Sequence, residues 1–324
     1  MMKVGVTGAS GFVGGALVKH LSANIAGCSV LAISRGPVYD FKKNGERLET
    51  LKVRDYSDTG LYEKNFEGLD VLVHVAAKVH DMSEKHSNVL EAYREANCSN
   101  TLKLADAASR MGVKRFVFLS TVKVSGEFSQ HGKALTELSD NEFKDAYATS
   151  KFEAERALMN DFSSLMDIVV IRPPLIYGPG VKANFNTMMV WLVRKIPLPL
   201  GSIQNKRSLV SIDNLIDFIV VCSEHPAAAN EVFMVSDCQD LSIRDILVKL
   251  GGALGYSAKL IAVPELFLRV LSKVLGKQEV VNRLCNSLVV NCDKAKELLD
   301  WSPPFSLDEG FKKTAEHFLS SDVK

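Results

Sequence analysis

Tyr147 and Lys151 stand four residues apart in a segment that we predict to be helical, and this spacing places them on one helix face. A cation near a phenol favours the phenolate and lowers the phenol pKa, so the tyrosine could act as an acid or base near neutral pH. Ser120-Thr121 ends a predicted strand and offers a hydroxyl that can hydrogen-bond a reacting alcohol or carbonyl. The same spacing also occurs on ordinary helix surfaces, so the interpretation depends on the surrounding elements.

Glycines at the start of the chain indicate a dinucleotide site. Gly8, Gly11 and Gly14 lie between an apolar strand predicted over 3–7 and a helix predicted over 12–21. Such glycines permit a tight turn, close approach of the backbone to a pyrophosphate, and close packing of the helix on the sheet. In that context the pattern favours a dinucleotide over a bare structural turn. The expected contacts are Gly8, Ser10, Gly11, Phe12, Val13 and Gly14.

Strands and helices alternate through the first half of the chain. The predicted strands are 3–7, 29–34, 49–54, 70–75, 115–120 and 167–172, and further helices are predicted over 58–66, 84–111 and 145–162. Strands that are apolar throughout and separated by helices predict a parallel sheet covered on both faces. Right-handed crossovers then give an α/β, doubly wound Rossmann fold.

The alternation ends at Arg172-Pro173-Pro174, where two prolines interrupt regular structure. We predict a nucleotide-binding domain over 1–172, to which the chain returns at about 207–236. A smaller, mainly helical substrate lobe is predicted over 173–206 and 237–324. The cleft between the two is the expected small-molecule site.

The end of the second predicted strand bears on cofactor choice. NAD sites commonly carry an acid at this position, whereas NADP sites offer a cation. Arg35 stands there, and no acidic residue follows until Asp40. A guanidinium can pair with a 2′-phosphate, so NADP(H) is favoured, with NAD and a solvated loop arginine as the alternatives. Further cofactor contacts are expected from Asp55 and Tyr56 near the adenine and from Val75, Ala76 and Ala77 along the ribose.

Composition excludes several classes of protein. The 324 residues include 39 basic and 38 acidic side chains, so no bulk field favours nucleic acid or an anionic membrane. The six cysteines form no CxxC pair, the seven histidines show no metal-ligand spacing, and we expect no metal. The apolar stretch 266–275 is too short to span a bilayer and predicts an amphipathic helix packed internally or on a partner. Without a secretory leader, the protein is expected in the cytoplasm.

The sequence resembles the extended short-chain dehydrogenase/reductase family, in its nucleotide-sugar epimerase/dehydratase group. Three motifs carry the resemblance over essentially the whole chain: the glycine turn ending at Gly14, Tyr147 with Lys151, and the stretch 172–180. It implies that Tyr147 is the acid/base and that Lys151 holds the nicotinamide ribose. Counting back from Gly126 places the substrate-binding hydroxyl on Thr121.

The resemblance also implies roles for four residues elsewhere in the chain. Asn97 and Pro174 are expected beside the cofactor, whereas Asn184 and Arg207 are expected to contact the nucleotide sugar, with Arg207 at its diphosphate. Three of them have a structural alternative: Asn97 could cap or bridge local backbone, Arg207 could form a surface ion pair, and Asn184 could simply begin a helix, since Asn is a good N-cap. Family members often form homodimers through paired helices, here parts of 84–111 and 145–162.

Val122-Lys123 restricts the reaction. Sugar 4,6-dehydratases of the family carry Asp-Glu directly after the catalytic threonine, and this chain lacks that pair. Hydride transfer at a sugar carbon remains, either as a net reduction or as an epimerisation. The chain resembles UDP-glucose 4-epimerase-like proteins, some of which are 4-reductases of UDP-4-keto-6-deoxy-N-acetylglucosamine in surface polysaccharide synthesis. Arg35 favours NADPH-dependent reduction of such a UDP-sugar. The alternatives are a UDP-glucose or UDP-N-acetylglucosamine 4-epimerase with bound NAD, and a non-catalytic NADP-binding regulator.

Overall fold

The computed structural model describes residues 2–37, 48–79, 89–129, 133–139 and 145–321. Seven strands form one parallel sheet in the order β3-β2-β1-β4-β5-β6-β9. Their bounds are β1 Lys3–Thr7, β2 Ser29–Ser34, β3 Leu48–Lys52, β4 Val71–His74, β5 Arg115–Leu119, β6 Asp167–Arg172 and β9 Glu231–Met234. The predicted doubly wound Rossmann fold is confirmed.

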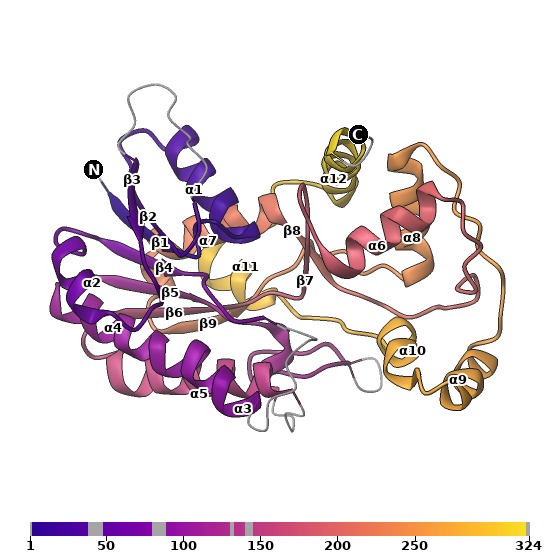
Figure 1. Cartoon of the computed structure of the whole chain (residues 1–324), viewed down its shortest axis with the longest axis horizontal. Helices are drawn as coiled ribbons and strands as arrows, with labels where there is room; N and C mark the ends of the chain where they lie inside the picture. The colour runs from indigo at the N-terminus through magenta and orange to yellow at the C-terminus, as the bar shows by residue number, and fades with distance from the viewer. Residues whose placement is uncertain (1, 38–47, 80–88, 130–132, 140–144, 322–324) are drawn as a thin grey trace.

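Helices cover both faces of this sheet (Figure 1). One layer contains α1 (Phe12–Asn24), α7 (Ile212–Glu224) and α11 (Asp293–Leu299), and the other contains α2 (Thr59–Asn65), α4 (Asn100–Arg110) and α5 (Ala146–Phe162). In β4, Val71 and Val73 pack into the first core, and Leu72 packs into the second. Because alternate residues face opposite apolar layers, the central strands are apolar at every position.

The strand order reverses between β1 and β4. From β1 the chain proceeds to β2 and β3 on one side, whereas β4, β5, β6 and β9 extend the sheet on the other. In parallel α/β sheets, ligands bind outside the carboxyl ends of the strands at such a reversal. The glycine turn follows β1 and Val75 follows β4, so both stand at this point.

The helix predicted over 84–111 is interrupted. Residues 84–88 lie outside the described residues, and the chain then forms α3 (Val89–Arg94), a π-helical turn η1 (Glu95–Ser99) and α4. Such single π turns are common at functional sites. Here the π turn contains Asn97, one of the predicted site residues.

A third core lies beyond the sheet, toward the right of Figure 1. It is built from α6 (Ala183–Val193), α8 (Ile243–Leu254) and α12 (Leu307–Ser321), beside the two-stranded sheet β7 (Leu175–Tyr177) and β8 (Leu209–Ser211). Helices α9 (Glu265–Val274) and α10 (Gln278–Cys285) extend this lobe, and short 3-10 turns occur at η2 (Val122–Val124) and η3 (Pro226–Ala228). Within the described residues, no helix combines the length and apolarity needed to cross a membrane.

One helix departs from the predicted domain boundaries. The sequence assigned 237–324 to the lobe, but α11 returns to the sheet, where Ala295, Leu299 and Trp301 join the first core. Trp301 Nε1 donates to Asp217 of α7 at 2.8 Å. The sequence of this short helix does not indicate whether it packs on the sheet or in the lobe.

Candidate active site

The glycine turn forms a tight cradle between β1 and α1. Gly8 has φ +67°, a conformation that favours glycine, and the Gly11 N–H donates to Gly8 O at 2.8 Å. A Cβ on Gly14 would lie 2.2 Å from Gly8 O, which is inside van der Waals contact. Gly14 therefore allows α1 to start directly against the turn.

These residues fit a dinucleotide. Helix α1 begins after Gly11 with no side-chain cap and no acidic residue in its first turn, so its N-terminal N–H groups and partial positive charge can meet a pyrophosphate.

At the end of β5, the buried Ser120 Oγ lacks a hydrogen-bond partner among the described residues. A buried unsatisfied hydroxyl is uncommon and marks a place where a bound group could supply the partner.

Arg35 is exposed directly after β2, as its predicted role requires. It lies close enough to Tyr56 for its charge to favour the phenolate, although burial outweighs this effect and raises the pKa of Tyr56. Tyr56 Oη accepts a 3.0 Å hydrogen bond from the Gly8 N–H, which ties the segment after β3 to the glycine turn. Asp55 is exposed and accepts from both the Ser57 amide and the Ser57 hydroxyl, which lower its pKa.

The segment after β4 is held by a buried chain of hydrogen bonds. His74 Nδ1 lies 2.7 Å from Thr7 Oγ1, His74 Nε2 lies 2.9 Å from Thr101 Oγ1, and the Ala76 N–H donates to Thr7 Oγ1 at 3.2 Å. Burial lowers the pKa of His74 to about 3, so the imidazole stays neutral. This neutral histidine fixes the backbone where Val75, Ala76 and Ala77 were predicted to meet the ribose.

Asn97 fixes the next residue along this segment. Its Oδ1 accepts from the Lys78 N–H at 2.7 Å, and its Nδ2 donates to Lys78 O and Ser150 Oγ, both at 3.1 Å. Asn97 therefore ties the segment after β4 to α5, a bridge to distant rather than local backbone. The π turn places this buried amide between the two elements.

Thr121 lies at the carboxyl end of β5. Its Oγ1 accepts from the Lys123 N–H at 3.3 Å and caps η2. The Val122 N–H donates to Pro173 O at 2.9 Å, which draws the buried Pro174 and its neighbours toward the same end of the sheet. A hydroxyl that accepts from backbone still has its own proton to donate to a substrate oxygen.

Tyr147 and Lys151 project from the first turns of α5, but the predicted lowering of the tyrosine pKa is not found. Burial, with smaller effects from Asp145 and Tyr93, raises the pKa of Tyr147 to about 12. The Lys151 ammonium instead lies 3.8 Å from the centre of the Phe118 ring in β5, and burial lowers its pKa to about 7. Desolvation of both groups outweighs the attraction on which the sequence argument relied.

A second cation lies beside Tyr147. Lys123 Nζ lies 2.5 Å from Asp145 Oδ2 and 5.9 Å from the centre of the Tyr147 ring. Asp145 also caps α5, because its Oδ1 accepts from the Tyr147 N–H at 3.0 Å. Sequence reasoning used Lys123 only to exclude dehydration and missed this pair, since the two residues are 22 positions apart.

The two residues predicted to contact the nucleotide sugar, Arg207 and Asn184, have surroundings that differ from those expected. Arg207 Nη1 donates to Arg283 O at 2.8 Å and Asn286 O at 3.3 Å, so carbonyls at the end of α10 hold it rather than the surface carboxylate considered as the alternative. Asn184 is exposed as the second residue of α6, and Lys182 rather than Asn184 occupies the N-cap position. Asn184 therefore lies at the beginning of a helix, as its structural alternative has it, but does not cap that helix.

Comparison with known proteins agrees with this architecture. A model of the NAD dependent epimerase/dehydratase family matches residues 4–236. The UDP-glucose 4-epimerase of Vibrio cholerae is 41% identical over 321 residues, covering 98% of this chain and 95% of that protein. The N-acetyl-alpha-D-glucosaminyl-diphospho-ditrans,octacis-undecaprenol 4-epimerase of Escherichia coli O157:H7 is 23% identical, covering 96% of this chain and 93% of that protein.

Solved structures share the fold over the whole chain. UDP-glucuronic acid 4-epimerase from Bacillus cereus, in complex with NAD, has a TM-score of 0.79 at 23% identity, covering 98% of this chain and 97% of that one. UDP-glucose 4-epimerase from Thermotoga maritima, with UDP-glucose, has a TM-score of 0.78 at 21% identity and covers 100% of both chains. With the family match over 4–236 and the Vibrio relative at 41% identity, this chain belongs to the NAD dependent epimerase/dehydratase family.

Proposed function

We propose that the protein transfers hydride at C4 of a UDP-linked sugar, with Tyr147 as the general acid/base. The observation that carries this proposal is the position of α5 against β5. Lys151 Nζ lies 3.8 Å from the centre of the Phe118 ring, so the helix that bears Tyr147 is anchored on the strand that leads to Thr121. Both Thr121, directly after β5, and the glycine turn, directly after β1, follow the carboxyl ends of strands of the same parallel sheet, which supports a common site at that edge.

Each group of residues has a separate role in the proposed reaction. The glycine turn and the N-terminus of α1 bind the pyrophosphate, and a nicotinamide dinucleotide held there would accept or supply the hydride. The Thr121 hydroxyl orients the C4 oxygen of the sugar. Tyr147 moves the proton at that oxygen. Lys151 holds the nicotinamide ribose.

Two directions of the chemistry are open, and each has an observation in its favour. Arg35, exposed at the end of β2 and close to Tyr56, favours a 2′-phosphate, hence NADPH and net reduction of a UDP-4-keto sugar. The 41% identical Vibrio relative is a UDP-glucose 4-epimerase, which favours 4-epimerisation. We propose reduction as the first candidate and 4-epimerisation as the second.

One experiment separates them. The purified protein is given either UDP-glucose or UDP-N-acetylglucosamine without added cofactor, or a UDP-4-keto-6-deoxy-N-acetylhexosamine with NADPH. Loss of NADPH absorbance in the second mixture supports reduction, and interconversion of C4 epimers in the first supports epimerisation. Failure of both reactions in protein shown to bind the dinucleotide would contradict the proposal.

Tyr147→Phe tests the proposed acid/base. We expect turnover to fall by about 10²–10⁴-fold, because the proton at the C4 oxygen loses its donor or acceptor. Dinucleotide affinity should stay within about twofold, since the glycine turn is untouched. Steady-state kinetics and a cofactor titration measure the two effects. Unchanged turnover would contradict the assignment.

A further inference from the structure

Helix α9 presents an exposed row of apolar side chains at the end of the lobe. Leu266, Phe267 and Val274 are 75%, 61% and 79% exposed, and Val270 and Leu271 are exposed as well. In a helix these positions share one broad face, because they recur at intervals of one, three and four residues. Leu268 and Ser272, which pack inward, lie on another side of the helix. A face of this kind on a soluble domain marks an interaction surface.

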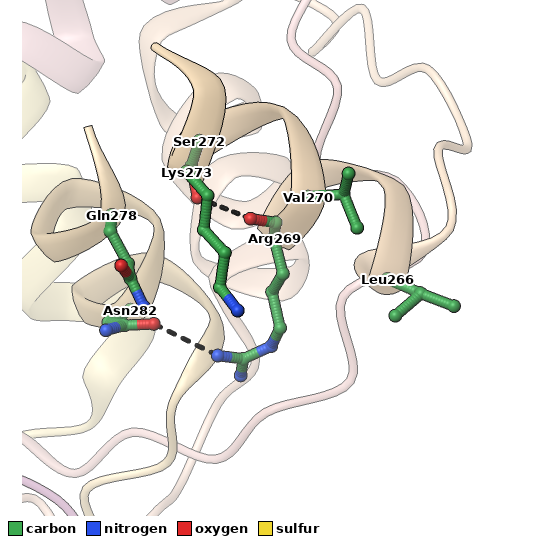
Figure 2. A pocket seen from close by; sticks show the side chains of 7 residues that line it. All are labelled: Leu266, Arg269, Val270, Ser272, Lys273, Gln278 and Asn282. Atoms are coloured by element: carbon green, nitrogen blue, oxygen red, sulfur yellow. Dashed lines mark hydrogen bonds between the residues drawn. The ribbon is translucent and has the colours of Figure 1, made fainter. Parts of the chain in front are cut away.

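The polar side chains of α9 occupy a third side. Figure 2 shows Arg269 and Lys273 projecting toward Asn282 of α10, whereas Leu266 and Val270 project away from it. Arg269 Nη1 donates to Asn282 Oδ1 at 3.0 Å, which holds the two helices together. The apolar face is therefore presented outward with a cationic margin along one edge.

The charges on this margin are unevenly matched. Glu265 pairs with Arg269 at 2.6 Å, and Glu279 lies 3.9 Å from Arg283. Lys273 and Lys277 are exposed, and within the described part of the chain neither forms an ion pair. Although the whole chain is nearly neutral, this surface combines an apolar row with two uncompensated ammonium groups.

We propose that α9 docks the protein on an anionic lipid surface. The row from Leu266 to Val274 would enter the boundary between headgroups and acyl chains, and Lys273 and Lys277 would meet anionic headgroups. Amphipathic helices with an apolar face and a cationic margin bind membranes in this way, through apolar burial and electrostatic attraction together. A second copy would instead add the same two lysines, and its Glu265 and Glu279 already lie beside Arg269 and Arg283, so it complements the lysines less well than anionic headgroups do.

The docked helix would lie next to the predicted substrate end of the lobe. Helix α10 follows α9, and its final carbonyls hold the Arg207 guanidinium. In Figure 1, α9 and α10 lie at the end of the lobe, away from β3 and α2. Docking would thus hold the lobe against the bilayer and leave the sheet in solution. This inference does not depend on the reaction proposed above, because it concerns only binding to lipid.

Cosedimentation with vesicles tests it on the full chain. We expect binding to phosphatidylcholine vesicles that contain phosphatidylglycerol, and at least about tenfold weaker binding to phosphatidylcholine alone. Rising salt should weaken the binding, because it screens the lysine contribution. A Phe267→Trp variant reports insertion, since its added emission should shift to shorter wavelength on the anionic vesicles.

Variants on the helix separate the two contributions. Val270→Asp/Val274→Asp should reduce binding to anionic vesicles by about tenfold or more, and Lys273→Glu/Lys277→Glu should abolish the preference for phosphatidylglycerol. Val248→Asp is the matched control, because Val248 is a 50% exposed valine on α8. It should bind as the unchanged protein does. Circular dichroism checks that each variant is folded.

Two results would overturn the proposal. The first is a folded protein that does not bind anionic vesicles, or that binds them equally after the valine substitutions. The second is a dimer, measured by light scattering, that dissociates in Val270→Asp/Val274→Asp while vesicle binding is absent, which would assign the face to a second copy. Neither result bears on hydride transfer, so the two proposals can fail separately.

Discussion

At the scale of single residues, burial dominates the chemistry of the site. The side chain of Lys151, on the buried face of α5, is almost fully inaccessible to solvent. Desolvation lowers the pKa of its ammonium to about 7, although Glu155 opposes the shift. Tyr147 is affected in the opposite sense, since desolvation raises the pKa of its phenol to about 12. Both shifts favour the neutral form of each group. Without a dinucleotide, the Tyr147 phenol therefore stays neutral and the Lys151 amine is partly neutral near pH 7. The ribose hydroxyls of a bound dinucleotide would change the solvation of both groups.

Lys151→Met tests the lysine shift in protein without dinucleotide. In the folded chain Lys151 releases its proton near pH 7, whereas an unfolded lysine keeps it to about 10.5, so the unfolded chain binds more protons between these values. Stability should therefore rise with pH in this window and be lost as pH falls toward 7. From about pH 7 to pH 9, the unchanged chain should gain about 2 kcal/mol of unfolding free energy relative to Lys151→Met. Urea denaturation at both pH values measures it, and equal slopes in the two proteins would contradict the shift.

Arg35→Ala tests cofactor choice. If the guanidinium pairs with a 2′-phosphate, the variant should lose about tenfold in NADPH affinity and less than about twofold in NADH affinity. Lys19→Ala, at an exposed position on α1, is a control for general loss of positive charge. Fluorescence titration with both dinucleotides gives the ratio. An unchanged preference in Arg35→Ala would assign the arginine to solvent and favour NAD.

At the scale of elements, the site depends on how closely helices approach the carboxyl ends of strands. Helix α1 begins against the turn only because Gly14 has no side chain. Helix α5 is held at Ser150 by Asn97 of the π turn and at Lys151 by the Phe118 ring. Its next turn carries Glu155, which forms a buried ion pair with Arg172 at 2.6 Å. Three successive contacts thus fix the helix that bears Tyr147.

Gly14→Ala tests the first of these contacts. The added Cβ would meet Gly8 O at 2.2 Å and Ala9 N at 3.1 Å, both backbone atoms, so α1 must move outward. We expect a loss of about 1–3 kcal/mol in stability and loss of measurable dinucleotide binding. Gly252→Ala is the control, because it lies inside α8 with nothing within 4 Å of its added Cβ. It should stabilise the protein by up to about 1 kcal/mol. Normal dinucleotide binding in Gly14→Ala would contradict the role given to the turn.

At the scale of the whole molecule, a buried polar cluster joins the lobe to the sheet. Asp237, which follows β9 closely, accepts from Tyr177 Oη at 2.7 Å, from the Ser211 N–H at 2.9 Å and from Asn214 Nδ2 at 2.7 Å. These donors come from β7, β8 and α7. The Tyr177 ring also stacks on Phe185 of the lobe core, with ring centres 5.5 Å apart. The carboxylate therefore sets how the lobe meets the sheet.

Tyr177→Phe tests this junction. The change removes one hydrogen bond to a buried carboxylate and keeps the ring, so we expect a loss of about 1–3 kcal/mol in unfolding free energy. Tyr256→Phe, at a half-buried position near Lys195, should change it by less than about 0.5 kcal/mol. Thermal unfolding compares the two. Equal midpoints would show that the Tyr177 hydroxyl contributes nothing at the junction.

Local pattern predicted the sheet domain well because its signals are short-range. The strands predicted over 29–34 and 167–172 coincide with β2 and β6, and the stretch of about 207–236 predicted to return to the sheet contains β9. The boundaries of the lobe were harder to predict, because the sequence of an amphipathic helix does not specify which core the helix joins. Helix α11 is the example, since it packs on the sheet. The π turn at Asn97 also escaped prediction, since it is stabilised by contacts to Lys78 and Ser150 rather than by its own sequence.

By itself the sequence determined the parallel sheet, the glycine turn and the helix face shared by Tyr147 and Lys151, because glycine conformation, apolar periodicity and helical spacing act over a few residues. The family and the role of Thr121 were implied by the resemblance of its motifs. Only the tertiary structure decided the directions in which the pKa values of Tyr147 and Lys151 shift, the Lys123–Asp145 pair beside Tyr147, and the carbonyls that hold Arg207. Those properties arise from desolvation and from partners distant in the chain, and both exist only once the elements have packed.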